Sequence, residues 1–272
     1  MENQFANTID TIIISDLHLG SDLSRAEDAV RMLKRYSFRR LILLGDIFCD
    51  LNFARLKKEH WRFLSYIRKL SNPKRGVEVV WVEGNHDRGL THVMSHLVGV
   101  RVYQQYSWED GVHKCLAIHG HQFDRFVVNN EFISKFGAWI YLLLQKLDSG
   151  GKHFSRFLDQ LNSAWLRLTP KVASGALAYA KLHGADVVFC GHTHEAIQVE
   201  QGGVAYYNTG CWTSSNPTYV TVGQEGVEIH EYQQRSDDCD SSQERGEVVA
   251  EAFDLAFDAG LPADAGYEGV RC

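Results

Sequence analysis

Short runs of apolar, often β-branched residues recur along the chain and stop abruptly at polar residues. Runs of this length predict strands buried in a central sheet. Helical periodicity follows the first two runs, through Tyr36 and from Lys57 to Leu70, and Ser24 and Glu27 have the spacing of a capping box before the first helix. This alternation of strands and helices indicates an α/β layered fold. The predicted strands cover residues 11–14, 41–44, 77–82, 114–118, 186–190 and 205–207, followed by a hairpin near 223–226.

The pattern changes between about residues 124 and 183, where the periodicity is helical and no strand is indicated. Apolar side chains in this block fall on two faces at helical spacing. Eight Lys and Arg residues stand against three acidic residues from Arg125 to His183, so the polar side is basic. We interpret the block as a helical insertion, or lid, between two strands of the core. The two faces comprise Phe132, Phe136, Trp139, Ile140, Leu143 and Leu144, and Phe157, Leu158, Leu161, Trp165 and Leu168.

Residues 233–272 differ in composition from the rest of the chain. They carry ten acidic residues against three arginines, whereas the whole chain of 272 residues has a formal net charge of -6. The preceding part is therefore close to neutral. Low hydrophobicity and clustered acids predict disorder. We expect a folded domain over residues 1–232, with the insertion inside it, and an acidic, disordered tail over residues 233–272.

Composition narrows the cellular context and the classes of partner. The six cysteines form no CxxC pair, which predicts the reduced thiols of a cytoplasmic protein. No apolar run is long enough to span a bilayer, so we expect at most peripheral contact of the basic insertion with an anionic inner membrane. The near-neutral body shows no long basic stripe, and we therefore expect no nucleic-acid partner.

Side chains able to bind metal follow five of the predicted strands. Ligands of α/β sheets bind outside the carboxyl ends of the strands, so these segments are expected to converge. Each motif alone is common in turns, where Gly and Asn tolerate positive φ. Their joint occurrence after apolar runs instead predicts one site built from distant segments. The motifs are Asp16-Leu17-His18, Gly45-Asp46, Gly84-Asn85-His86-Asp87, His119-Gly120-His121 and Gly191-His192-Thr193-His194.

In this order, the motifs resemble those of the calcineurin-like metallophosphoesterase superfamily: D-x-H, G-D, G-N-H-D/E, a single histidine and G-H-x-H. The likeness extends from Asp16 to His194. It implies an α/β fold built as a four-layer α/β/β/α sandwich, and a metal-dependent hydrolase of phosphoric esters or diphosphates. Two adjacent divalent ions suit this chemistry because they lower the pKa of the attacking water and neutralise charge at phosphorus.

The resemblance also implies which residues hold each ion. Asp46 would be shared, because a carboxylate between two cations offsets their repulsion, and Asn85 would also contact the substrate. Nitrogen and oxygen ligands without thiolate suit Mn²⁺, with Fe, Co or Zn as alternatives. The first ion would be held by Asp16, His18, Asp46 and His194, and the second by Asp46, Asn85, His119 and His192.

Further residues are assigned roles beside the ions. His86 is expected to be catalytic, donating a hydrogen bond to a transferring oxygen or protonating the leaving group, with Asp87 or Asp50 orienting its ring. His119 directly follows a predicted strand and is taken as the ligand, while His121 is assigned to the substrate phosphate. An exchange of roles between these two histidines stays open.

A narrower resemblance is to the bacterial UDP-2,3-diacylglucosamine hydrolases of lipid A biosynthesis. It rests on the segment from Ile14 to Gly20, on the step from Gly45 to Phe48, and on the helical insertion. It implies cleavage of a nucleotide-linked, lipid-linked diphosphate to UMP and an acyl-sugar 1-phosphate. His86 stands where those hydrolases typically carry arginine. The alternatives are a phosphodiesterase acting on a cyclic nucleotide or other small diester, and a non-catalytic scaffold.

Overall fold

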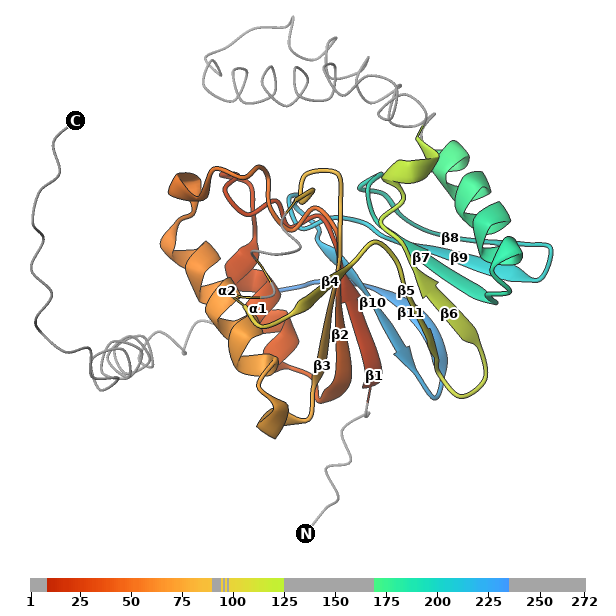
Figure 1. The fold of residues 1–272 in the computed structure, drawn as a ribbon, viewed down its shortest axis with the longest axis horizontal. Coiled ribbons are helices and arrows are strands. Elements are labelled where there is room, and N and C mark those ends of the chain that lie inside the picture. Colours follow the sequence, from red (N-terminus) through yellow and green to blue (C-terminus); the bar gives the residue numbers. More distant parts are fainter. Residues whose placement is uncertain (1–8, 90–93, 95, 97, 125–168, 235–272) are drawn as a thin grey trace, which may run out of the picture. The chain divides into compact units, whose positions relative to one another are not determined.

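The computed structural model describes residues 9–89, 94, 96, 98–124 and 169–234 (Figure 1). Nearly all of these residues belong to a compact unit, Met1–Tyr232, that is separate from Gln233–Cys272. The predicted insertion falls largely outside the described residues, as does the predicted acidic tail, and both stay predictions. Within the described ranges, no helix combines the length and apolar character needed to cross a bilayer.

Eleven strands and a small number of helices make up the described part of the fold. The strands are β1 (Ile9–Ile14), β2 (Phe38–Leu44), β3 (Glu78–Val82), β4 (Arg101–Tyr103), β5 (Tyr106–Glu109), β6 (Lys114–Ala117), β7 (Val187–Cys190), β8 (Ala196–Gln201), β9 (Val204–Thr209), β10 (Thr218–Gly223) and β11 (Gly226–Glu231). The helices are α1 (Ala26–Lys34), α2 (Lys58–Leu70), the 3₁₀ turns η1 (Phe53–Arg55), η2 (Pro73–Arg75) and η3 (His121–Phe123), and a helix whose described part covers residues 169–182.

The strands form two sheets. The first has the order β11-β10-β1-β2-β3-β4, with β1 to β4 parallel and β10 antiparallel to β1. The second has the order β5-β6-β7-β9-β8, with β6, β7 and β9 parallel. Parallel neighbours end at the same edge of their sheet. The loops after β1, β2 and β3 therefore leave one edge together, as do those after β6 and β7.

Side chains alternate across each sheet and divide the core into three layers. Ile13 of β1 and Phe189 of β7 belong to the layer between the sheets. The neighbouring Ile12 packs with α1 and α2 on the outer face of the first sheet, and the helix over 169–182 packs with Val188 on the outer face of the second (Figure 1). Both faces of the central strands are covered, which explains their continuous apolar runs. The predicted α/β/β/α sandwich is confirmed.

The local predictions hold except at the first helix and in the short strands. All six predicted strands, the hairpin and both early helices are present. The predicted capping box is wrong: the N-cap is Arg25, and no side chain caps the helix. The hydroxyl of Ser24 is buried without a hydrogen-bond partner. Strands β4, β5 and β8 were not predicted, because they are short or lie at sheet edges with largely polar, exposed side chains.

Candidate metal centre

Backbone hydrogen bonds tie together the loops that carry the predicted ligands. The amide of Asp16 donates to Gly45 O at 3.0 Å, and the amide of His18 donates to Asp46 O at 3.0 Å. In the second sheet, the amide of Gly191 donates to the carbonyl oxygen of His119 at 3.0 Å. Parallel strands therefore place the loops at common edges, and direct bonds then fix them to each other.

Six of the seven predicted ligands fall into two groups of close ligand atoms. Within each group, one atom from every residue lies within 4.8 Å of the others. In the first group, Nε2 of His194 lies 3.1 Å from Asp16 Oδ1, and Nε2 of His18 lies 3.2 Å from Nε2 of His194. In the second, Nε2 of His119 lies 3.3 Å from Asp46 Oδ2. The groups are Asp16, His18 and His194, and Asp46, His119 and His192.

Asn85, the seventh predicted ligand, lies beside the second group. The backbone amide of the next residue, His86, donates to Asp46 Oδ1 at 2.8 Å. The side-chain oxygen of Asn85 is buried and has no hydrogen-bond partner. A buried amide oxygen without a partner, in a loop that contacts Asp46, is expected of a metal ligand rather than of a satisfied core group.

The site is built from backbone conformations that most residues avoid. Among the described residues, the non-glycine residues with positive φ all belong to the two groups, and their φ values range from 48° to 69°. Such conformations cost of order 1–3 kcal/mol each and cluster at functional sites. They are Asp16, His18, Asp46, His192 and His194.

Glycines leave the space that the ligands fill. A Cβ at Gly45 would overlap the ring of His119, and one at Gly84 would overlap the backbone nitrogen and Oδ1 of Asp46. A Cβ at Gly191 would overlap the carboxylate of Asp16. These three glycines in the motifs are therefore required by close packing around the ligands.

The unsatisfied atoms of the site show that its residues fit metal ions. Buried polar atoms normally have hydrogen-bond partners, and each exception needs an explanation. Five of the nine buried side-chain atoms that lack one in the described residues belong to this site. Both oxygen and imidazole nitrogen are represented, which matches the expected donor set. Three of them are expected ligand atoms, Asp16 Oδ1, Asn85 Oδ1 and His119 Nε2. The other two are His121 Nδ1, on a ring outside both groups, and His192 Nε2, which lies 3.6 Å from Asp124 Oδ2.

Charges within the site shift the pKa values of its ligands strongly. Burial would raise the pKa of Asp46, but the charge of His119 and other nearby histidines holds it well below its usual value. Burial lowers the pKa of His119, yet the negative charge of Asp46 close to its ring outweighs this and raises the pKa to about 9. In the same way Asp16 outweighs burial and raises the pKa of His194 to about 9.

Backbone carbonyl groups orient two of the rings. Nδ1 of His119 lies 2.8 Å from Leu44 O, and Nδ1 of His86 lies 2.7 Å from Cys49 O. If these nitrogens donate to the carbonyls, each ring has its Nε2 free. Nε2 of His86 lies 3.9 Å from Asp46 Oδ2, so it faces the second group.

The predicted role of Asp87 as the residue that orients His86 is corrected. The buried carboxylate of Asp87 accepts hydrogen bonds from the backbone amides of Ile47 at 3.1 Å and Phe48 at 3.0 Å. It therefore braces the loop after Asp46, because desolvated carboxylates need such donors. The other candidate, Asp50, pairs with Arg55 and also does not hold the ring.

The geometry favours His119 over His121 as the ligand. His119 lies in the second group, whereas His121 lies outside both groups. The ring centroids of His121 and His119 are 5.6 Å apart, so His121 borders the site. Its Nδ1 is buried without a hydrogen-bond partner. Burial lowers the pKa of His121 to about 3, which leaves its ring neutral at physiological pH.

The sequence did not reveal the side chains that brace the site from the second sheet. Nδ2 of Asn208 donates to Gly191 O at 2.6 Å and to the hydroxyl of Thr193 at 3.0 Å. Ser15 hydrogen-bonds the carboxylate of Asp16 and lies 2.6 Å from the hydroxyl of Thr209. The only signal was the position of Asn208 and Thr209 at the end of a predicted strand.

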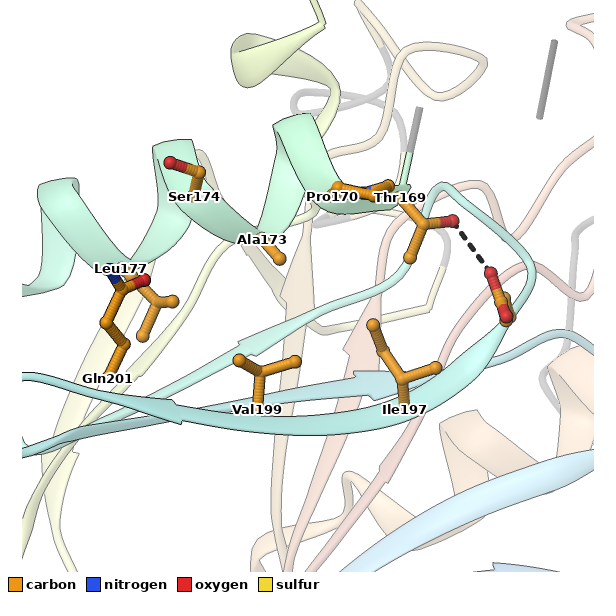
Figure 2. A pocket seen from close by; sticks show the side chains of 9 residues that line it. Thr169, Pro170, Ala173, Ser174, Leu177, Ile197, Val199 and Gln201 are labelled. Carbon is orange, nitrogen blue, oxygen red and sulfur yellow. Dashed lines mark hydrogen bonds between the residues drawn. The ribbon is translucent and has the colours of Figure 1, made fainter. Parts of the chain in front are cut away.

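A groove of about 360 Å³ lies between the helix over 169–182 and β8 (Figure 2). Ala173, Leu177 and Ile197 supply apolar walls, and the hydroxyl of Thr169 donates to Glu195 Oε2 at 2.9 Å across one end. None of the predicted site residues lines it. The groove is therefore not the predicted site.

Comparisons with solved structures find matches at low identity and with TM-scores below 0.5. An archaeal phosphodiesterase is 16% identical, with 82% of this chain and 99% of that chain covered and a TM-score of 0.45. YfcE, a phosphoesterase from E. coli, is 13% identical, with 83% and 98% covered and a TM-score of 0.47. Vps29 from Cryptosporidium parvum is 16% identical, with 84% and 93% covered and a TM-score of 0.44.

No curated protein sequence matches the chain at a significant level. The family model of the calcineurin-like phosphoesterase superfamily domain matches residues 9–225, which is well over half of the chain and includes all the predicted ligands. The predicted resemblance is thereby confirmed at the level of the superfamily. The chain belongs to the calcineurin-like phosphoesterase superfamily.

Proposed function

We propose that the protein hydrolyses phosphoric esters or diphosphates with two divalent ions, Mn²⁺ in the first instance. The observation that carries this proposal is the pair of ligand groups, in which the buried atoms Asp16 Oδ1 and His119 Nε2 lack hydrogen-bond partners. In a scaffold without metals, the strained backbone at these five positive-φ residues would cost stability without a functional reason. The non-catalytic alternative is therefore disfavoured.

The residues present define how the ions would be held. Asp16, His18 and His194 would bind one ion and Asn85, His119 and His192 the other, with Asp46 shared. When bound, two such ions activate water and neutralise the charge that develops on the phosphoryl group. Mixed nitrogen and oxygen ligands suit Mn²⁺, Fe, Co or Zn better than Ca²⁺.

Two histidines that are not assigned as ligands would act on the substrate. His86 has its Nδ1 at the carbonyl of Cys49 and its Nε2 toward Asp46, so a ring protonated on both nitrogens would donate the Nε2 proton to the leaving oxygen. His121 is neutral and buried at the edge of the second group, where it would hydrogen-bond a phosphate oxygen. Asn85 would contact the same phosphate from the opposite loop.

The finer proposal is that the substrate is a UDP-linked acylated sugar similar to UDP-2,3-diacylglucosamine. Its support is the resemblance of the motif segments to those hydrolases and the basic, apolar composition of residues 125–168. Such a segment suits an anionic diphosphate that carries acyl chains. On this proposal the protein acts in the cytoplasm, with peripheral contact at the anionic inner membrane.

The competing substrate is a cyclic nucleotide or another small diester. It is favoured by His86, which follows the general superfamily pattern rather than the arginine typical of the lipid-sugar hydrolases. Both substrates would use the same ions and the same histidines. Only product analysis separates them.

The test incubates purified protein with Mn²⁺ and UDP-2,3-diacylglucosamine, in parallel with 3′,5′-cyclic AMP and bis-p-nitrophenyl phosphate. The proposal expects UMP from the first substrate, and no UMP from Asp46→Asn or from protein treated with a chelator. Hydrolysis of the diesters without UMP would replace the lipid-sugar proposal with the diester alternative. Inactivity toward all three in the presence of bound Mn²⁺ would contradict both.

A further inference from the structure

Asp124 is a buried carboxylate beside the second ligand group that has no assigned role. It follows η3, and its backbone amide donates to His121 O at 3.2 Å. Its Oδ2 lies 3.6 Å from Nε2 of His192, and both side chains are buried. The backbone of Asp124 is thus held in the turn after His119. Its carboxylate lies near His192, a predicted ligand in the loop after β7.

The ring of His192 is oriented through its Nε2, whereas the rings of His119 and His86 are oriented through their Nδ1. In His119 and His86 it is Nδ1 that meets a backbone carbonyl. In His192 it is Nε2 that faces a carboxylate, and this nitrogen makes no hydrogen bond. The separation of 3.6 Å exceeds an ordinary N–H···O hydrogen bond by about 0.6 Å, so a hydrogen bond between them requires the two side chains to move closer.

We propose that Asp124 is the positioning residue of His192: it accepts a hydrogen bond from Nε2 and so leaves Nδ1 as the atom that binds the second ion. Histidines that bind metal generally donate their other ring N–H to a carboxylate or carbonyl group, which fixes the tautomer and strengthens the ligand. This inference rests on the proposed pair of ions, but not on any substrate.

A carboxylate at this position also changes the charge of the centre. The ligands include two carboxylates, Asp16 and Asp46, which neutralise about half of the four positive charges of two divalent ions. Asp124 adds a negative charge in the same buried region without occupying a coordination position. A backbone carbonyl, which serves His119, would orient the ring but would not supply this charge.

The test measures metal binding by the full-length protein, stripped of metal and titrated with Mn²⁺ alone by calorimetry. Wild type is compared with Asp124→Asn, which keeps the shape but removes the charge, and with Asp124→Ala. Asp186→Asn is the control, because Asp186 is an exposed carboxylate directly before β7 that accepts from the amide of Lys114 at 2.8 Å. We expect both Asp124 variants to weaken one of two Mn²⁺ sites by about 10–100-fold, and the control to match wild type.

The melting temperature of the metal-free proteins separates a positioning role from a structural one. The proposal expects the loss of Mn²⁺ affinity in Asp124→Asn to be confined to one site, whereas a structural role would lower the metal-free melting temperature and weaken both sites. Unchanged Mn²⁺ affinity in Asp124→Asn overturns the proposal. A lower melting temperature of the metal-free variant, together with equal losses of Mn²⁺ affinity at both sites, also overturns it. Wild type that binds no Mn²⁺ would instead overturn the pair of ions itself.

Discussion

Single residues at the centre are held in conformations and contacts that the rest of the fold must maintain. Asp46 shows this most clearly: its φ is 49°, its Oδ1 accepts from the amide of His86, and its Oδ2 lies 3.3 Å from His119. Gly84 packs directly against it. The positive φ and the close packing of Gly84 are unfavourable in isolation, and both become understandable if Asp46 is the ligand shared by two ions.

Gly84→Ala is expected to disturb Asp46 and weaken Mn²⁺ binding. The new Cβ would overlap the nitrogen and Oδ1 of Asp46, and such overpacking costs about 1–3 kcal/mol. Calorimetric titration with Mn²⁺ and urea denaturation would measure the two effects. Gly223→Ala is the matched control, since its Cβ would enter open space and, like Gly84, it has no positive φ. Equal behaviour of the two variants would contradict the packing argument.

Metal binding at pH 7.5 is expected to release protons. Asp46 and Asp16 raise the pKa values of His119 and His194 to about 9, against the effect of burial. Both rings are therefore protonated on both nitrogens and positively charged in the metal-free protein at pH 7.5. A metal ligand must be neutral, and binding therefore expels about two protons. The release should vanish above pH 10, where the rings are already neutral.

Calorimetry in buffers of different ionisation enthalpy measures this release directly. His119→Gln should reduce it by about one proton, because one of the two titrating rings is absent. Substitution of His183, which lies outside both ligand groups, serves as the control. A binding enthalpy that is the same in every buffer would refute the prediction.

At the scale of elements, the centre depends on contacts between two sheets that are formed by residues far apart in the chain. Asn208 at the end of β9 holds the loop after β7, and Thr209 meets Ser15 at the end of β1. The amide of His192 donates to Asp16 Oδ2 at 3.1 Å. The contacts of Thr209 and His192 join the loops of one sheet to those of the other, whereas Asn208 braces neighbouring strands within the second sheet.

Asn208→Ala is expected to destabilise the protein by about 1–3 kcal/mol, because it leaves the buried carbonyl of Gly191 without this donor. Urea denaturation of the metal-free protein measures the loss. Gln198→Ala is the control: its side chain also bonds across the β8–β9 pair, at 3.0 Å to Tyr207, but it is exposed. A change below about 0.5 kcal/mol, as at ordinary surface positions, would count against the bracing role.

The elements also show what the sequence could and could not reveal. Central strands were predictable because both faces are buried, which requires continuous apolar runs such as that of β1. The edge strand β8 was not, because most of its side chains are exposed. The ligands were predictable because they follow strands in fixed motifs. The side chains that support the ligand loops were not predictable. Ser15 and Thr209, for example, are 194 positions apart, and no local sequence pattern indicates their contact.

Across the whole molecule, the metal-free centre is costly to the fold. It gathers strained backbone, buried atoms without hydrogen bonds and close like-charged groups in one place. Ions that satisfy these atoms bind the folded state and not the unfolded chain. Bound ions should therefore raise the free energy of unfolding and offset the cost of this site.

We expect Mn²⁺ to raise the melting temperature of the metal-stripped protein. At a free concentration about 100 times the Kd, one site contributes about 2.7 kcal/mol, which corresponds to roughly 5–10 °C for a domain of this size. Differential scanning fluorimetry against Mn²⁺ concentration provides the measurement. Ca²⁺ should stabilise less, because four of the seven ligands are imidazoles and Ca²⁺ prefers oxygen.

Asp46→Ala distinguishes this centre from adventitious binding elsewhere on the chain. The shared carboxylate belongs to both ion positions, so its removal should abolish most of the shift. Asp110→Ala is the comparison, because Asp110 is also a carboxylate with a histidine neighbour, His113, yet lies outside both ligand groups. It should keep the wild-type response to Mn²⁺. An equal shift in Asp46→Ala and wild type would mean that the stabilising ions bind somewhere other than this pair of groups, whatever reaction the protein catalyses.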